Sequence, residues 1–269
     1  MIFFCGIDIG SLSTDCVIID NEKNILGFSI IPTGHNAMEA ALKAQEIALG
    51  KANVSKDKLS FTVSTGYGRY GTSLSQKSFT EITCHATGAL HFFPNAKCVI
   101  DVGGQDSKII KISQSGKVED FMMNDKCSAG TGRFIEVMAN SLNTPLEKMG
   151  SLGIKSKKDI NINSTCTVFA ESEVVALVAK NVPKADIING IHKSISKKLK
   201  SMVIQMKCLP PYVMTGGVAK NIGIRTALED AFGKNVDVIS EPQIVGATGA
   251  ALLAKREYNK ISTELKTKS

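Results

Sequence analysis

One pattern occurs twice in this chain of 269 residues, and it constrains the possible folds more than any other feature. Residues 4–31 read FCGIDIGSLSTDCVIIDNEKNILGFSII, and residues 97–123 read KCVIDVGGQDSKIIKISQSGKVEDFMM. In each copy an apolar strand ends in Asp-x-Gly, and a polar turn, a second strand, a tight turn and a third strand follow. This order is typical of a three-stranded meander. Repetition of a whole unit predicts two related domains that face each other.

Helical and strand patterns alternate over the rest of the chain. Helices are expected near 36–52, 80–93, 131–142, 168–180 and 184–207, a strand at 61–66, and strand-to-helix units at 211–224 and 236–259. Strands that alternate with helices predict an α/β fold. The expected domains are residues 1–94 together with 245–269, and residues 95–244.

Composition excludes several classes of protein. The net charge of +7 comes from 28 lysines and only 4 arginines, without tryptophan or aromatic-basic interleaving, so nucleic acid is not the expected partner. The longest apolar stretches, such as VVALVA at 174–179, are too short to span a membrane. The N-terminus, MIFFCGIDIG, reads as a first strand and not as a signal peptide. We therefore expect a cytoplasmic protein.

The two Asp-x-Gly segments are candidates for nucleotide binding. Asp8 and Asp101 each end a strand beside glycines, which let backbone N–H groups approach a phosphate closely. A carboxylate at that place can hold Mg²⁺, mostly through water. A single Asp-x-Gly is more often a plain hairpin turn. Two of them at equivalent places in a repeat favour phosphate binding.

A third glycine turn, MTGGVAKN at 214–221, completes a trio that resembles the actin, sugar-kinase and heat-shock-chaperone ATPase superfamily. The resemblance implies two duplicated ribonuclease-H-like domains with a nucleotide cleft between them, and connecting helices at TEITCHATGA (80–89) and IVGATGAALLA (244–254). It implies that Asp8 and Asp101 hold the metal's water shell and that three segments bind the nucleotide. Gln105 is a candidate to orient the attacking water, and Glu81 to organise either the Mg²⁺ shell or that water. The implied contacts are Gly10, Ser11, Leu12, Ser13, Thr14 and Asp15 for phosphate one, Gly103, Gly104 and Gln105 for phosphate two, and Gly216, Gly217, Val218, Asn221 and Gln243 for the nucleoside.

Two of the seven cysteines stand apart from the others. No two cysteines form C-x-x-C, which argues against a metal site within one chain. Cys127 and Cys166, however, each come just before a predicted helix, where N–H donors and partial positive charge favour a thiolate. An iron–sulfur cubane needs four thiolates. A symmetric dimer would supply them, with one cluster on its two-fold axis.

The motifs GIDIGS, STGYGR, DVGGQD, NDKCSAGTGRF, STCTVFAESEV and TGGVAKN together resemble the ATPase activators of (R)-2-hydroxyacyl-CoA dehydratases, in the BadF/BadG/BcrA/BcrD ATPase family. The resemblance implies a homodimer with one [4Fe–4S] cluster held by Cys127 and Cys166. It also implies that hydrolysis of MgATP drives one low-potential electron to a dehydratase, with reduced ferredoxin or flavodoxin as donor, in an anaerobe that ferments amino acids. Leu12 and Asp15 depart from the family, in which threonine and lysine are common. The phosphate contact is therefore expected from Ser11, Ser13, Thr14 and backbone N–H groups, with Lys108 of the other domain as a further candidate.

Alternatives remain open on the sequence alone. A small-molecule kinase has the same fold, and the ATPase subunit of a benzoyl-CoA-reductase-like enzyme belongs to the same family. A nucleotide-sensing assembly protein is a third reading, and it would lack a chromophore. Arg133 could pair with Glu136 or face a partner, and the four histidines share no ligand spacing.

Overall fold

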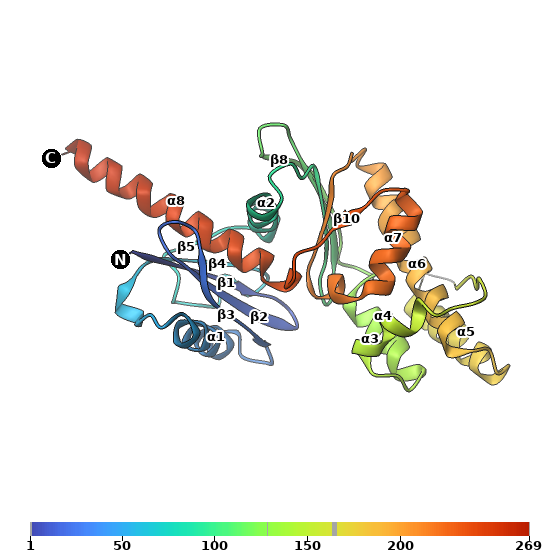
Figure 1. The fold of residues 1–269 in the computed structure, drawn as a ribbon. Helices are drawn as coiled ribbons and strands as arrows, with labels where there is room; N and C mark the ends of the chain where they lie inside the picture. Colours follow the sequence, from blue (N-terminus) through green and yellow to red (C-terminus); the bar gives the residue numbers. More distant parts are fainter. Residues whose placement is uncertain (1, 128, 163–165, 269) are drawn as a thin grey trace. The chain divides into compact units, whose positions relative to one another are not determined.

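The computed structural model describes residues 2–127, 129–162 and 166–268, and they form two compact units (Figure 1). The first unit is Met1–Pro94 with Gln243–Ser269, and the second is Asn95–Pro242. Gln243 and Ile244, which were expected in the second domain, therefore belong to the first unit. None of the helices in the described ranges is long and apolar enough to cross a bilayer.

The sheet of the first unit has the order β3-β2-β1-β4-β5. Its strands are β1 (Phe3–Ile9), β2 (Ser13–Ile19), β3 (Ile25–Pro32), β4 (Leu59–Thr65) and β5 (Lys77–Ser78). β1 pairs antiparallel with β2 and parallel with β4. Every residue of β1 is buried, as expected of a strand covered on both faces.

Helices cover both faces of this sheet (Figure 1). On one face lies α1 (Ala37–Ala52), which Asn36 caps by accepting from the N–H of Glu39, and η1 (Lys56–Lys58) follows it. On the other face lies α8 (Val245–Lys268), with α2 (Glu81–Phe92) packed against it. Close packing here requires a glycine, because a Cβ on Gly249 of α8 would lie 1.8 Å from the carbonyl oxygen of Cys84.

The sheet of the second unit has the order β10-β9-β6-β7-β8. Its strands are β6 (Cys98–Val102), β7 (Ser107–Ile112), β8 (Val118–Asn124), β9 (Tyr212–Thr215) and β10 (Val236–Asp237). β6 pairs antiparallel with β7 and parallel with β9, as β1 does with β2 and β4. The predicted repeat and the α/β class are confirmed.

The second unit carries more helices between its third and fourth strands than the first unit does. They are α3 (Gly132–Ser141), α4 (Leu146–Gly153), α5 (Thr167–Ala179) and α6 (Lys184–Gln205); η2 (Gly217–Lys220) and α7 (Ile222–Phe232) follow β9, and η3 (Pro242–Ile244) leads to α8. α6 supplies the centre of the core through residues such as Ile188, Ile191 and Ile195. The sequence did not predict α4.

Candidate functional site

The two Asp-x-Gly turns close in the same way. In the first unit the N–H of Gly10 donates to the carbonyl oxygen of Ser13 at 2.9 Å, and in the second the N–H of Gly103 donates to that of Asp106 at 3.0 Å. The aspartates below them, Asp8 and Asp101, are 8% and 2% exposed. Each turn is thus a pre-formed backbone loop above a buried carboxylate.

The tips of these turns are accessible, as a phosphate site requires. Leu12 and Gln105 are exposed, and the half-buried residues of the tips are Gly10, Ser11, Ser13, Gly103 and Gly104. Thr14 differs, because it is buried and its Oγ1 lies 2.9 Å from Oγ1 of Thr33. Thr33, which the sequence did not single out, also donates to the carbonyl oxygen of Gly10 at 2.8 Å. The hydroxyl of Thr14 therefore supports the turn from inside the unit.

The aspartate of the second unit is held by a cation. Asp101 is the cross-strand partner of Lys108, whose Nζ lies 3.3 Å from Oδ2 of Asp101 and 2.8 Å from Oδ1 of Asp106. Thr215 donates from Oγ1 to Oδ1 of Asp101 at 2.8 Å. The three charged side chains are all buried. Lys108, a candidate phosphate contact from the sequence, is committed to these two carboxylates.

The aspartate of the first unit has different neighbours. Asp8 is the cross-strand partner of Asp15, which is also buried and receives a hydrogen bond from Oγ of Ser13 at 3.3 Å. His85, on α2, places Nε2 3.7 Å from Oδ2 of Asp8. Gly246, in the first turn of α8, lies so close that a Cβ there would be 2.1 Å from Oδ2 of Asp8. His85 was not predicted to belong to the site, since its spacing from other residues gave no signal.

A second threonine-glycine pair extends the repeat beyond the meanders. Thr65 lies in register with Asp8 across β1 and β4, as Thr215 does with Asp101 across β6 and β9. The glycines that follow, Gly66 and Gly216, have φ of +85° and +84°, a conformation that favours glycine. The shared letters S-T-G and M-T-G at two strand ends were the signal that could have revealed this pair.

The segment expected to bind the nucleoside is divided between two roles. Gly217 is exposed at the start of η2, whereas Gly216 and Val218 are buried. Asn221 caps α7, because its Oδ1 accepts from the N–H groups of Gly223 at 3.0 Å and Ile224 at 3.2 Å. The side chain of Asn221 is therefore used to begin a helix.

His192 on α6 lies beneath that cap. Its Nε2 is 3.4 Å from Nδ2 of Asn221, and Gly223 is so close that a Cβ there would lie 2.3 Å from its Nδ1. Burial lowers the pKa of His192 to about 4, so the ring is neutral at physiological pH.

Gln243 and Glu81 lie in the first unit. Gln243 donates from Nε2 to Oγ of Ser13 at 2.9 Å, which places its side chain at the phosphate-one turn. Glu81 is the first residue of α2 and is half-buried, and Thr80 caps this helix by accepting from the N–H of Thr83. Gln243 thus contacts a predicted phosphate-binding residue of its own unit.

Cys127 and Cys166 are half-buried, whereas the other five cysteines are buried. Cys166 is the N-cap residue of α5, and α3 begins at Gly132 after the Cys127 turn. Ser128 and residues 163–165, which belong to the predicted motifs, lie outside the described residues. Within the described ranges no group of three or more His, Cys, Asp or Glu could hold a metal ion.

The phosphate-two turn is hydrogen-bonded to the helix that follows Cys127. The N–H of Gly132 donates to the carbonyl oxygen of Gly103 at 2.9 Å, and the N–H of Arg133 donates to that of Gly104 at 2.8 Å. These are first-turn N–H groups, which α3 itself leaves without partners. The side chain of Arg133 pairs with Glu136 at 3.0 Å and remains 60% exposed. A shift of the turn must therefore move the start of α3.

The helix that follows Cys166 presents apolar side chains to solvent. Val168 and Phe169 are 65% and 66% exposed, and Val175 is 53% exposed. Only Ala170 and Val174 of α5 are buried. An exposed apolar face of this kind, next to a thiol, is typical of a surface that binds another protein.

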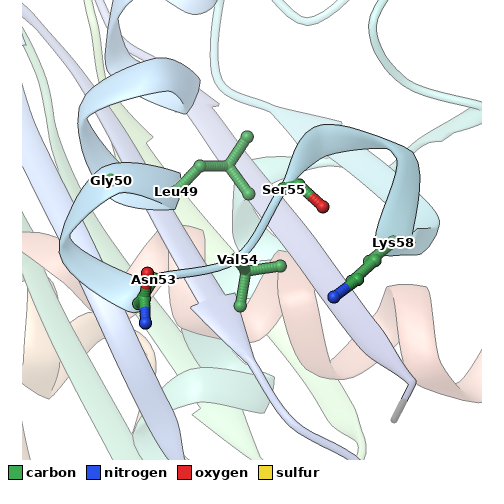
Figure 2. A pocket seen from close by; sticks show the side chains of 6 residues that line it. All are labelled: Leu49, Gly50, Asn53, Val54, Ser55 and Lys58. Atoms are coloured by element: carbon green, nitrogen blue, oxygen red, sulfur yellow. The ribbon is translucent and has the colours of Figure 1, made fainter.

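A hollow of about 300 Å³ lies elsewhere, at the end of α1 (Figure 2). It is open to solvent and is lined by Leu49, Gly50, Asn53, Val54, Ser55 and Lys58. None of these is a predicted site residue. Lys58 is its single charged side chain, so the hollow offers no group of convergent polar atoms.

Comparison with known proteins decides the family. A profile of the BadF/BadG/BcrA/BcrD ATPase family matches residues 5–254. The chain belongs to this family. Its relatives include the (R)-2-hydroxyglutaryl-CoA dehydratase activating ATPase of Acidaminococcus fermentans, 42% identical over 96% of this chain and 99% of that protein. The 2-hydroxyisocaproyl-CoA dehydratase activator of Clostridioides difficile is 38% identical over 97% of this chain and 98% of that protein.

Solved structures of family members match the whole fold. The component A structure from A. fermentans gives a TM-score of 0.92 at 41% identity, over 96% of this chain and 100% of that one. The C. difficile activator, solved with bound ADPNP, gives 0.93 at 38% identity, over 97% of each chain. A ROK family glucokinase from Streptomyces griseus, 14% identical over 94% of this chain and 99% of that one, gives 0.57 and shows the fold alone. The fold is of the actin-like ATPase and sugar-kinase type.

Proposed function

We propose that this family member is a cytoplasmic ATPase that activates an (R)-2-hydroxyacyl-CoA dehydratase by passing it one low-potential electron. The observation that carries the proposal is the pair of half-buried thiols, Cys127 and Cys166, in a chain whose relatives include dehydratase activators. A kinase of the same fold would leave both thiols without a role.

A [4Fe–4S] cluster suits this donor set, since thiolates are its usual ligands. Two copies of the chain supply four thiolates, with one cluster per homodimer. The exposed apolar side chains of α5, such as Val168 and Phe169, form the surface that contacts the second copy. When bound, the cluster supplies a one-electron store, which reduced ferredoxin or flavodoxin fills.

The glycine turns bind MgATP. Because the N–H of Gly10 closes its own turn, the amides of Ser11 and Leu12 are the ones that meet phosphate, with Gly104 and Gln105 from the second turn. Asp8 is the main holder of the Mg²⁺ water shell, because Lys108 and Thr215 already bind the carboxylate of Asp101. Gln105, exposed at the tip of its turn, orients the attacking water, with Glu81 as a second candidate. Gly216, Gly217 and Val218 approach the nucleoside.

ATP hydrolysis is coupled to Cys127 through the first turn of α3. Loss of the terminal phosphate changes the contacts of Gly104 and Gln105, and the bond from Arg133 to Gly104 passes that change to the first turn of α3. Movement of this turn alters the N–H groups and the solvent near Cys127, and such changes tune reduction potential. For a one-electron couple, about 59 mV is a tenfold bias.

An anaerobic activation assay tests the proposal. The chain is mixed with a 2-hydroxyacyl-CoA dehydratase, a reductant and either ATP or ADPNP, with 2-hydroxyglutaryl-CoA and 2-hydroxyisocaproyl-CoA as substrates of the matching dehydratases. We expect dehydration with ATP only, and none with Cys127→Ser. A chain that hydrolyses ATP and activates no dehydratase, or that phosphorylates a sugar, would contradict the proposal.

A further inference from the structure

The segment that carries Cys127 is a tight turn held in place by side chains from other elements. Asn124, the last residue of β8, donates from Nδ2 to the carbonyl oxygen of Cys127 at 2.8 Å. Gly130 has φ of +88°, which other residues rarely adopt, and both Ala129 and Gly130 are buried. The backbone next to Cys127, which lies between β8 and α3, is thus held by the side chain of Asn124.

Lys198 of α6 supplies the second hold on this turn. Its Nζ donates to the carbonyl oxygen of Ala129 at 2.6 Å. Its stem packs on the turn, because Cδ of Lys198 lies 3.1 Å from the position of a Cβ on Gly130. A hydrogen bond from a charged donor is short and stronger than a neutral one. A half-buried ammonium is therefore fixed close to the Cys127 backbone.

The same helix also holds the segment that leads to Cys166. Asp186, in the first turn of α6, accepts from the N–H groups of Lys157 at 2.8 Å and Lys158 at 3.1 Å, which lowers the pKa of its carboxyl group. Gly190 leaves room for the carbonyl oxygen of Ile160, which would lie 2.8 Å from a Cβ there. α6 is thus a common base for both cysteine-bearing segments.

We propose that Lys198 is a positioning residue for Cys127 and that its ammonium favours the reduced state of a cluster bound there. The first part depends only on the contacts of Ala129 and Gly130. The second part rests on the proposed function, since net charge near a cluster helps to set its potential. Reduction adds one electron, which dithionite supplies in the test, and breaks no bond.

The test compares three variants of the full-length protein with wild type. Lys198→Met keeps an apolar stem and removes the donor and the charge, and Lys198→Arg keeps both. Lys200→Met is the matched control, because Lys200 lies on the same helix and its Nζ donates to the carbonyl oxygen of Ala231 in α7. In cluster-free protein, we expect hydrogen–deuterium exchange of amides 129–132 to become at least about tenfold faster in Lys198→Met alone.

The second readout is the midpoint potential of the anaerobic, iron-loaded proteins. In Lys198→Met we expect the ratio of reduced to oxidised protein at a fixed potential to fall about tenfold, or about 59 mV for a one-electron couple. Lys198→Arg should restore it. The inference would be overturned if Lys198→Met exchanged amides 129–132 as slowly as wild type, or if its midpoint potential equalled that of Lys200→Met. An iron-free wild type would overturn the proposed function and the electrostatic part, while the exchange comparison still decides the positioning.

Discussion

The two units of this protein build the same hairpin around different partners for the strand-end aspartate. In the second unit the strand-end aspartate, Asp101, faces Lys108 across the hairpin and receives a hydrogen bond from Thr215. In the first unit the equivalent aspartate, Asp8, faces a second carboxylate, Asp15. Topology and turn closure are shared, whereas the charge of the buried pair is not. Duplication has therefore kept the backbone and let one copy specialise.

The difference assigns separate tasks to the two hairpins. A buried carboxylate that is already paired with a lysine gains little from a metal ion, whereas two facing carboxylates are stabilised by one. We therefore expect divalent cations to bind at the first hairpin. The second hairpin instead transmits movement to α3 through its backbone hydrogen bonds.

Removing the cation of the second hairpin should have the largest effect. Lys108→Met leaves Asp101 and Asp106 buried without their partner, and breaking a buried pair in this way costs about 3–5 kcal/mol of the free energy of unfolding. Urea denaturation measures it. Lys111 lies on the same strand as Lys108 and forms a partly exposed pair with Glu119 of β8, so Lys111→Met should change the stability little. Equal stability of the two variants would mean that Lys108 does not neutralise this hairpin.

Between pH 6.5 and 4, acid should destabilise the second unit more than the first, in which His91 also has a pKa lowered by burial but is exposed, whereas His192 is buried. The folded pKa of His192, about 4, lies below its ordinary value of 6.5, so its stabilising contribution is present above pH 6.5 and is lost as pH falls toward 4. The contribution is on the order of 3 kcal/mol, at about 1.4 kcal/mol per unit of pKa. In the first unit, hydrogen bonds from Lys77 and Lys260 lower the pKa of Glu257 to about 2, so its contribution is lost only below pH 4.5.

Exchange measured separately for the two units between pH 7 and 3 tests this order. His192→Gln should flatten the response of the second unit between pH 6.5 and 4 and leave that of the first unit unchanged. If the first unit opens at the higher pH, the assignment of these two groups is wrong.

The equivalent threonines should respond differently to the same substitution. Thr215→Val removes a hydrogen bond to a buried carboxylate and should cost about 2 kcal/mol. Thr65→Val should cost less than about 1 kcal/mol, since the side-chain partner of Thr65 is the thiol of Cys84, which is a weaker acceptor than a carboxylate. Thermal unfolding of both variants checks the prediction. A larger loss in Thr65→Val would show that the first hairpin also depends on its threonine.

The smallest expected effect concerns the facing carboxylates. Asp15→Asn removes like charge opposite Asp8 and should stabilise the metal-free protein by up to about 1 kcal/mol. The same variant should gain less stability from added Mg²⁺ than wild type does. Asp15→Lys, which copies the second hairpin, should abolish that gain. An undiminished Mg²⁺ response in both variants would contradict the division of tasks between the hairpins.

The fold could be predicted because its signals are local and repeated. Asp-x-Gly turns, strand alternation and helix periodicity each lie within a few residues, and the repeat made two weak motifs mutually supportive. Cys127 and Cys166 could be singled out for the same reason, since each comes just before a helix. That they ligate a cluster remains a prediction.

The parts that the sequence did not reveal depend on partners distant in the chain. Lys108 pairs with Asp101 and Asp106 because two strands meet in register, and Asn221 caps α7 above His192 because α6 passes beneath it. Gln243 contacts Ser13 although 230 residues separate them. Such contacts are set by packing, and the periodicity of residues along the chain does not predict them.

Under the proposed function, two copies of the chain share one cluster through Cys127 and Cys166. Iron and acid-labile sulfide per dimer of anaerobically purified protein test it most directly, beside Cys127→Ser, Cys166→Ser and the control Cys84→Ser, whose buried thiol has a pKa raised to about 12. The account predicts about four of each in wild type and in the control, and loss in both other variants. An iron-free wild type after anaerobic reconstitution, or full iron in Cys127→Ser, would contradict it.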